Sequence, residues 1–369
     1  MQYIFILGNT PKLSLAEIKA VLPDLQFIRE FNDVLIVESP KELDANNLIN
    51  ELGGTIKIAA VTSTSPLQET EKMQGERKKF GFSLYRLNDD ISNNILKNLK
   101  LDLKKQGLKY KKELRAKGIR SEVIESKDLF LSSVIISKEK CLDIIALVDK
   151  DNKIIYGKTL AVQPFREYSA RDYDRPSRDP RSGMLPPKVA RMMVNIACGD
   201  KEKIFLDPFC GSGTILQEAL LLGYKKVYGS DISKKAVTDT ENNLKFLKLN
   251  SYQLSVCDAR QLQLKNISTV VSEVYLGPIN VNSEKIDAVI GELITLYYES
   301  FKHLKPLLAP NAKLVIAFPA WRTNNGILRL PIEKTLLDLG YTIKDRPIIY
   351  GRPDARVLRE IYIMNGGIQ

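Results

Sequence analysis

The feature that most constrains this chain is a glycine-containing loop of sequence DPFCGSGT at residues 207–214. Apolar residues at 204–206 predict a strand just before the loop, and the pattern over 214–222 predicts a helix just after it. Glycines at such a strand–helix junction let the backbone pass close to a bound ligand. We therefore expect a ligand site at the carboxyl end of this strand.

The loop also restricts the kind of ligand. It lacks the pattern G-x-x-x-x-G-K-[ST] of a phosphate-binding loop and the pattern G-x-G-x-x-G of a dinucleotide site. Asp207 at its start would repel a pyrophosphate but would suit the ammonium group of an amino acid. These observations favour a ligand with an ammonium and a ribose but no phosphate, and S-adenosylmethionine has this chemistry.

Residues from 188 onward alternate between predicted helices and short apolar strands. This alternation predicts an α/β fold with a doubly wound, mostly parallel sheet, in which ligands bind beyond the carboxyl ends of the strands. Acidic residues follow the next three predicted strands and would reach the same edge of the sheet: Asp231, Asp258 and Glu273.

The chain is basic, with 55 Lys and Arg against 44 Asp and Glu and a formal net charge of +11. This balance favours a polyanionic partner, most simply a nucleic acid. Residues 97–120 hold ten of the basic residues and two acidic ones, and we predict a helical hairpin there, with helices at 91–106 and 110–116. A solvated lysine-rich helix is the alternative interpretation. The residues that we expect to contact phosphates are Lys104, Lys105, Lys111, Lys112 and Arg115.

The cysteines and the histidine exclude several kinds of site. The four cysteines show no C-x-x-C spacing, and His303 is the single histidine. A disulfide framework, a metal centre and a Ser-His-Asp triad are therefore not expected, and a reducing compartment such as the cytoplasm is. No run approaches the ~18 apolar residues of a membrane span, and no basic residues precede the apolar start as in a secretory signal.

The first half of the chain predicts a smaller α+β organisation. Residues 1–65 show strand and helix patterns, with a helix opening at Ser14, and a charged linker follows at 65–79. Later strands are predicted at 80–85, 120–124, 132–136, 143–148 and 153–161. Residues 163–187 show no periodicity and contain five prolines and five arginines, so we expect a connector without regular structure. Arg171 and Arg175 in this connector would suit contacts with a nucleic acid, or they belong to a plain domain linker.

The loop at 207–214 resembles the first cofactor motif of class I methyltransferases, in the D-P-F-x-G-S-G-T form found among N-methyltransferases of RNA and DNA bases. Asp231 resembles the acid that accepts both ribose hydroxyls of the cofactor, and Asp258 resembles the residue that receives its adenine amino group. The cofactor-binding residues that the resemblance implies are Asp207, Phe209, Gly211, Gly213, Thr214, Asp231, Ile232, Asp258, Ala259, Met184 and Pro186.

The fourth strand of such enzymes presents a D/N-P-P-Y motif, and here Glu273 and Tyr275 hold its acid and aromatic positions. An exocyclic base amine is a poor nucleophile because its lone pair is delocalised into the ring. A carboxylate that accepts its N–H groups can aim the lone pair at the methyl group, and an aromatic ring can stack on an extruded base. Glu273 would do the first and Tyr275 the second, whereas Val274 replaces the first proline.

Segments along nearly the whole chain resemble the THUMP-containing tRNA (guanine-10-N2) methyltransferases. They include FGFS at 80–83, GKTLAVQ at 157–163, YSARDY at 168–173, GMLPPK at 183–188 and YGRPDAR at 350–356. The resemblance implies a ferredoxin-like domain at 1–65, a THUMP RNA-binding domain at 66–165, a connector at 166–187 and a Rossmann-like class I methyltransferase domain with a seven-stranded sheet at 188–369. It also implies tRNA as the partner.

The leading hypothesis is thus an S-adenosylmethionine-dependent RNA base N-methyltransferase that forms N2-methylguanosine at tRNA position 10. The alternatives are a DNA adenine-N6 or cytosine-N4 methyltransferase and a noncatalytic tRNA-binding paralogue. The sequence leaves open the target nucleotide, the number of methyl groups added, the oligomeric state and the need for a small activator subunit.

Overall fold

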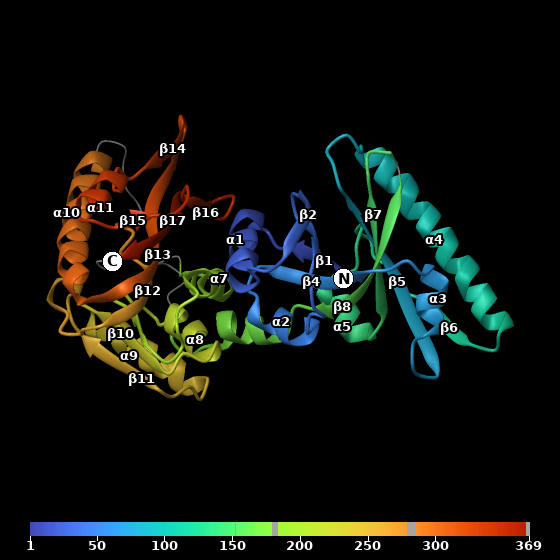
Figure 1. Cartoon of the computed structure of the whole chain (residues 1–369), viewed down its shortest axis with the longest axis horizontal. Helices are drawn as coiled ribbons and strands as arrows, with labels where there is room; N and C mark the ends of the chain where they lie inside the picture. Colours follow the sequence, from blue (N-terminus) through green and yellow to red (C-terminus); the bar gives the residue numbers. More distant parts are fainter. Residues whose placement is uncertain (152, 179–183, 279–284, 367–369) are drawn as a thin grey trace. The chain divides into compact units, whose positions relative to one another are not determined.

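The computed structural model describes residues 1–151, 153–178, 184–278 and 285–366 (Figure 1). They form two compact units, the first made of residues 1–14 and 22–167 and the second of residues 15–21 and 168–369. Among the described residues, no helix is both long enough and apolar enough to cross a membrane.

The first unit is built on one eight-stranded sheet with the order β2-β3-β1-β4-β8-β7-β5-β6. Its strands are β1 (Gln2–Leu7), β2 (Gln26–Phe31), β3 (Val34–Glu38), β4 (Thr55–Val61), β5 (Arg77–Arg86), β6 (Arg120–Val123), β7 (Leu142–Val148) and β8 (Ile154–Val162). The helices of this part of the chain are α1 (Pro11–Val21), α2 (Ala45–Glu51), α3 (Pro66–Glu71), α4 (Asn93–Ala116) and α5 (Ser133–Glu139). The strand order β2-β3-β1-β4 matches the ferredoxin-like arrangement expected for residues 1–65.

The expected boundary between residues 65 and 66 does not separate two sheets. Strand β4 lies before that boundary and β8 lies after it, yet they pair antiparallel, with Ile58 opposite Ala161. The hydrogen-bonded ladder therefore runs without a break from the first predicted domain into the second. The two predicted domains are halves of one sheet, which explains why residues 1–14 and 22–167 form a single compact unit.

The predicted helical hairpin is wrong, because α4 is one continuous helix of 24 residues. Ser92 caps its start by accepting a hydrogen bond from the backbone N–H of Ile95. Gly107, between the helices expected at 91–106 and 110–116, lies buried in the middle of α4. A Cβ atom there would come within 3.2 Å of Val123 and 3.3 Å of Phe82. This glycine thus allows the helix to approach the sheet closely and does not break it.

Three other local predictions are corrected. The strand expected at 132–136 is the helix α5, which Ser132 caps through the N–H of Ile135. The linker expected at 65–79 contains α3, which begins with a capping box between Ser65 and Gln68. Ser14 does not open a helix but lies inside α1, where its hydroxyl donates to the carbonyl of Thr10. The short apolar run at 132–136 fits a helix as well as a strand. In the other two cases the predicted start of the helix was misplaced or missed.

The second unit contains a nine-stranded sheet, in which seven strands follow the order β11-β10-β9-β12-β13-β17-β15 and the short β14 and β16 pair with β13 and β17. The strands are β9 (Ile204–Asp207), β10 (Lys226–Asp231), β11 (Tyr252–Val256), β12 (Ile267–Glu273), β13 (Leu308–Thr323), β14 (Gly326–Arg329), β15 (Thr342–Ile343), β16 (Ile348–Tyr350) and β17 (Val357–Gly366). Strands β9 to β13 run parallel and β17 runs antiparallel to β13. This confirms the predicted α/β, doubly wound fold.

Helices lie on both faces of this sheet, with α10 on one side and α7 on the other (Figure 1). They are α7 (Pro187–Ala197), α8 (Thr214–Leu221), α9 (Lys234–Phe246), α10 (Ile286–Leu304) and α11 (Glu333–Asp338), with short 3₁₀ turns at Ala259–Gln261 and Lys305–Leu307. Tyr297 and Phe301 of α10 form one buried cluster with Leu314, Ile316 and Phe318 of β13. This cluster fixes α10 against the strands whose ends carry the site.

The connector expected without regular structure is helical over part of its length. It begins with α6 (Phe165–Ser169) and continues as a π-helix (Ala170–Asp174). The Arg171 side chain of the π-helix donates to Glu218 of α8 at 2.8 Å, and Arg191 of α7 donates to the same carboxylate at 2.6 Å. All three groups are buried, so this ion triad holds the π-helix against α7 and α8.

A buried polar network joins four strands of the first unit. The Lys57 ammonium on β4 donates to Asp143 on β7 at 2.7 Å and to the Ser83 hydroxyl on β5 at 3.0 Å. The Thr159 hydroxyl on β8 donates to the same carboxylate at 3.0 Å. Because the Lys57 and Asp143 side chains are 1% and 0% exposed, each charge depends on the other for its stabilisation.

Replacing Lys57 tests this dependence. We expect Lys57→Met to lower the free energy of unfolding by about 3–5 kcal/mol, because the Asp143 carboxylate would remain buried without its cation. Urea unfolding measures the change. Lys105→Met is the matched control, since its partner Asp102 is exposed, and it should cost no more than about 1 kcal/mol. Equal losses for the two variants would contradict the role of the buried pair.

Candidate cofactor and base-binding site

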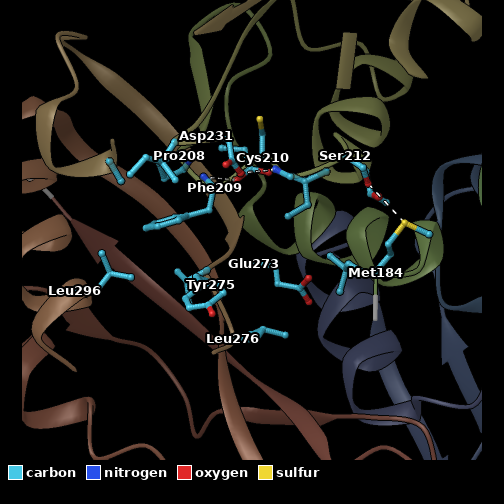
Figure 2. A pocket seen from close by; sticks show the side chains of 18 of the residues that line it. Met184, Pro208, Phe209, Cys210, Ser212, Asp231, Glu273, Tyr275, Leu276 and Leu296 are labelled. Carbon is cyan, nitrogen blue, oxygen red and sulfur yellow. Dashed lines mark hydrogen bonds between the residues drawn. The ribbon is translucent and has the colours of Figure 1, made fainter. Parts of the chain in front are cut away.

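A cavity of about 710 Å³ opens at the carboxyl ends of β9, β10 and β12 (Figure 2). Nine of the eleven residues predicted to bind a cofactor line it: Met184, Asp207, Phe209, Gly211, Thr214, Asp231, Ile232, Asp258 and Ala259. Glu273 and Tyr275 line it as well. In Figure 2, Phe209, Tyr275 and Leu296 lie on one side of the cavity and Met184 lies on the other. The structure therefore brings the predicted cofactor and catalytic residues to one site.

The other two predicted cofactor residues, Gly213 and Pro186, do not line the cavity. Gly213 precedes α8 with a φ of +83°, and a Cβ atom there would come within 2.7 Å of Thr240. This glycine thus lets the loop turn sharply and pack against α9. Pro186 is the residue before α7, where its extended backbone starts the helix. Each of them is next in sequence to a residue that lines the cavity, Thr214 for Gly213 and Leu185 for Pro186.

Asp207, the last residue of β9, is 1% exposed. Its carboxylate accepts hydrogen bonds from the Ser272 hydroxyl at 2.6 Å and from the Phe209 backbone N–H at 3.2 Å. Burial raises the pKa of Asp207 to about 7, although these two hydrogen bonds oppose the shift. A cation that enters the cavity beside Asp207 would favour its ionised form.

Asp231 ends β10, and among the described residues the hydrogen bonds to its carboxylate come from backbone groups. Its two carboxylate oxygens accept from the N–H of Gly211 at 3.0 Å and from the N–H of Ser233 at 2.9 Å. Gly211 has a φ of +51°, and a Cβ atom there would meet nothing within 4 Å. Because each oxygen keeps a further lone pair, the carboxylate can accept two hydroxyl groups of a ligand.

Asp258 lies at the start of the 3₁₀ turn after β11. The Arg260 side chain donates to both of its oxygens, at 2.6 Å in the shortest contact, and also to Glu299 at 2.8 Å. The hydrogen bond from Arg260 lowers the pKa of Asp258. A ligand amino group would therefore share an ionised carboxylate with Arg260, which itself lines the cavity.

Glu273, the last residue of β12, forms an ion pair that the sequence did not reveal. The Nε of Arg359 on β17 donates to its Oε1 at 2.5 Å. The Glu273 side chain is 20% exposed and that of Arg359 is 9% exposed. Burial raises the pKa of Glu273, and the charge and hydrogen bond of Arg359 lower it. Arg359 is 86 residues away in sequence, so no local pattern could have linked it to Glu273.

The backbone after Glu273 is held at two points. The Val274 N–H donates to the carbonyl of Ala317 at 3.2 Å, and the hydroxyl of the buried Tyr297 donates to the carbonyl of Tyr275. The Tyr275 side chain is 55% exposed and lines the cavity. These contacts fix the segment without the paired prolines of the D/N-P-P-Y motif, and they leave the Tyr275 ring accessible for stacking.

The two connector arginines expected to contact a nucleic acid are instead buried. Arg171 belongs to the ion triad with Glu218. Arg175 donates to the Thr214 hydroxyl at 2.7 Å and to the Met184 sulfur at 3.1 Å. Both side chains are less than a tenth exposed, so neither can reach a phosphate. Their contacts stabilise the start of α8 and the wall of the cavity, which corrects the prediction.

The five basic residues predicted on α4 are all exposed. Lys104 pairs with Glu125 at 2.7 Å, and Lys105 pairs with Asp102 at 3.1 Å. Lys111, Lys112 and Arg115 form no ion pair with any residue that the structure describes. These three therefore keep a full charge for an anionic partner.

The cavity fits S-adenosylmethionine, the ligand expected from the sequence. Within the described part of the chain, no Lys or Arg pairs with Asp207 or Asp231, so a cationic ligand meets uncompensated carboxylates. Apolar groups that suit an adenine ring, including Phe209, Ile232 and Leu296, line the same space. The cavity lining is thus acidic where the ammonium and ribose of the cofactor would lie and apolar where its adenine ring would lie.

Family comparisons agree with this chemistry. Residues 175–330 match the RMKL-like methyltransferase domain, and residues 88–242 match a DNA methylase domain. The tRNA (guanine(10)-N2)-dimethyltransferase of Methanothermobacter thermautotrophicus is 30% identical over 214 residues, which is 56% of this chain and 57% of the relative. The probable tRNA (guanine(10)-N2)-dimethyltransferase of Methanothermococcus thermolithotrophicus is 30% identical over 115 residues, which is 29% of this chain and 70% of the relative.

The match to the first of these relatives spans less than two thirds of its length. Among solved structures, TrmN from Thermus thermophilus has a TM-score of 0.55 with this chain, at 15% identity, and the match covers 99% of this chain and 100% of TrmN. At this identity the similarity shows a shared fold.

The raised pKa of Asp207 predicts a pH-dependent affinity for S-adenosylmethionine. Raising the pH through about 7 ionises Asp207, and the ionised form attracts the cationic ligand. Binding should therefore strengthen by roughly tenfold between about pH 6 and pH 7.5, as measured by isothermal titration calorimetry. Asp207→Asn should bind more weakly and without this dependence, whereas Asp200→Asn on an exposed turn should behave like the wild type. An unchanged pH dependence in Asp207→Asn would contradict the assignment.

Proposed function

The chain belongs to the family of tRNA guanine N2-methyltransferases, and from this premise we propose that it methylates the exocyclic N2 atom of a guanine in tRNA. Its cofactor is S-adenosylmethionine. The names of the curated relatives point to position 10 of the tRNA as the target.

One observation carries the proposal: Glu273 and Tyr275 line the same cavity as Asp207 and Asp231. A carboxylate that can accept N–H groups and an accessible aromatic ring thus share one cavity with the acidic groups that suit the cofactor. Methylation of an amine needs the base and S-adenosylmethionine to be held together in a defined geometry. The arrangement meets this requirement with groups from the ends of β9, β10 and β12.

In this mechanism the residues of the chain bind and orient the two substrates. S-adenosylmethionine would supply a methyl group on its sulfonium sulfur. Transfer would form the N–C bond, break the S–C bond with its electron pair left on sulfur, and release one amine proton to water. Glu273 accepts an N–H bond of the guanine amine and so aims its lone pair. Tyr275 stacks on the extruded base, and Asp231 accepts the ribose hydroxyls of the cofactor.

The first unit supplies the RNA-binding surface in this proposal. Residues 66–165 act as a THUMP domain, and the exposed Lys111, Lys112 and Arg115 of α4 contact tRNA phosphates. Basic side chains that are not neutralised by neighbouring acids are the ones that can release counterions from a polyanion. Lys104 and Lys105 contribute less, because each has an acidic partner.

Methyl transfer from labelled S-adenosylmethionine to unmodified tRNA tests the proposal, with duplex DNA in parallel. Digestion to nucleosides should release labelled N2-methylguanosine from the tRNA alone. Label in an amino-methylated adenine or cytosine of the DNA would move the function to a DNA methyltransferase. Cofactor binding without transfer to either substrate would favour a noncatalytic tRNA-binding protein.

Glu273→Gln should reduce kcat at least tenfold, because the neutral amide accepts the amine N–H more weakly than a carboxylate does. The affinity for S-adenosylmethionine should change little. Single-turnover transfer to tRNA measures the first quantity and calorimetry measures the second. Glu241→Gln on the exposed face of α9 is the control and should keep full activity. A loss below tenfold in Glu273→Gln would show that Glu273 is not the acceptor.

Replacing Lys111, Lys112 and Arg115 together by alanine should weaken tRNA binding and flatten its dependence on salt. If each contacts one phosphate, the slope of log affinity against log salt should fall in magnitude by about 2–3. Filter binding over a range of salt concentrations measures the slope. Alanine at Lys201, Lys225 and Lys226 removes the same charge from the second unit and should leave the slope closer to that of the wild type. Equal slopes for the two triple variants would contradict a phosphate-binding role for α4.

A further inference from the structure

We propose that Arg359 is a positioning residue for the reaction, which holds one carboxylate oxygen of Glu273 so that the other faces the guanine amine. The inference rests on the proposed function and adds a residue to it. Arg359 does not line the cavity, so it acts through Glu273 and not on the substrate.

The geometry of the sheet supports this assignment. Strand β13 lies between β12 and β17, with Ala317 opposite Glu273 on one side and Pro319 opposite Arg359 on the other. Across this strand, the Nε of Arg359 donates to Oε1 of Glu273 at 2.5 Å. No donor among the residues that the structure describes reaches Oε2 of Glu273. One oxygen is thus occupied, and the other remains for a ligand in the cavity that Glu273 lines.

The charges around Glu273 explain why it needs this arginine. The buried carboxylate of Asp207 on β9 interacts electrostatically with Glu273. The phenol of Tyr350 on β16 also interacts with Glu273. Burial raises the pKa of Glu273 and so favours the protonated acid, which is a weaker acceptor for an amine. The charge and hydrogen bond of Arg359 oppose this effect of burial, whereas Arg352 and Asp172 interact with Tyr350.

The length of the glutamate gives a second reason. Glu273 has one more rotatable bond than the Asp or Asn of the D/N-P-P-Y motif, so its carboxylate samples more positions when it is free. A fixed, planar guanidinium restricts that freedom before the substrate binds. The ion pair therefore compensates for the longer side chain.

The chain contains a matched control in Arg329. It donates to Glu360 at 2.9 Å, and Glu360 is the residue after Arg359 on β17. Glu360 is also buried, and burial raises its pKa. This second Arg–Glu pair, however, does not line the cavity. The two pairs thus differ in whether their carboxylate lines the cavity, and also in the exposure of the arginine, which is 56% for Arg329 and 9% for Arg359.

Arg359→Met and Arg359→Lys test the inference, with Arg329→Met as the control. Arg359→Met should lower kcat for tRNA methylation at least tenfold near neutral pH and leave the affinity for S-adenosylmethionine within about threefold. Part of the loss should return as the pH rises, because Glu273 would then ionise without its cation. Arg359→Lys should fall between Arg359→Met and the wild type, since it keeps the charge but loses the fixed geometry. Arg329→Met should keep the kcat and the pH profile of the wild type.

A kcat and pH profile like those of the wild type in a folded Arg359→Met would overturn the inference and leave the proposed function intact. Absence of transfer by the wild type would instead overturn the proposed function. The pairing can then be tested without activity, by NMR titration of the glutamate side-chain carboxyls labelled with carbon-13, with Glu273→Gln to assign the signal. The pKa of Glu273 should be higher in Arg359→Met than in the wild type, and equal values would overturn the inference. If Arg359→Met does not fold, the same two readouts on Arg359→Lys decide the question.

Discussion

The site depends on one physical constraint, which is that four carboxylates must be kept around a single cavity. The sheet brings Asp207, Asp231, Asp258 and Glu273 to its walls from the ends of neighbouring strands. Carboxylates that are withdrawn from water are stable only when donors or cations replace the water. How the chain supplies these partners determines what each carboxylate can do.

The partners divide the four carboxylates into two pairs. Asp207 and Asp231 receive hydrogen bonds from a hydroxyl and from backbone N–H groups but no cation among the described residues. Asp258 and Glu273 are each paired with an arginine. The first pair therefore attracts a cationic ligand, and the second pair presents acceptors that an arginine holds in place. The first pair thus suits the ammonium and ribose of the cofactor, and the second pair suits two neutral amino groups, those of the cofactor adenine and of the substrate guanine.

The sequence predicted the parts of the site that follow from local order. The loop at 207–214 and the alternation of strands and helices were sufficient for the α/β fold and for most of the cavity wall. The sequence did not predict contacts that only the folded sheet creates. Arg359 reaches Glu273 because β17 returns antiparallel beside β13, and no spacing in the sequence encodes that approach.

The wrong predictions have similar physical origins. The predicted helical hairpin breaks at Gly107, whereas this glycine allows the continuous α4 to pack closely on the sheet. The connector arginines were interpreted as RNA contacts, because a sequence shows their charge but not the buried Glu218 that Arg171 meets. The boundary at residue 65 was placed in a polar linker, whereas pairing of β4 with β8 continues the sheet across it. Each error came from a tertiary contact that outweighed a local signal.

A crystal structure with S-adenosylhomocysteine and a guanosine-containing RNA tests the central claim most directly. The account predicts that the exocyclic amine of the guanine lies within hydrogen-bond distance of Oε2 of Glu273, while Oε1 stays on Arg359. It also predicts the ribose of the cofactor on Asp231. A guanine bound away from Glu273, or an Arg359 that leaves Glu273 to contact the RNA, would contradict it.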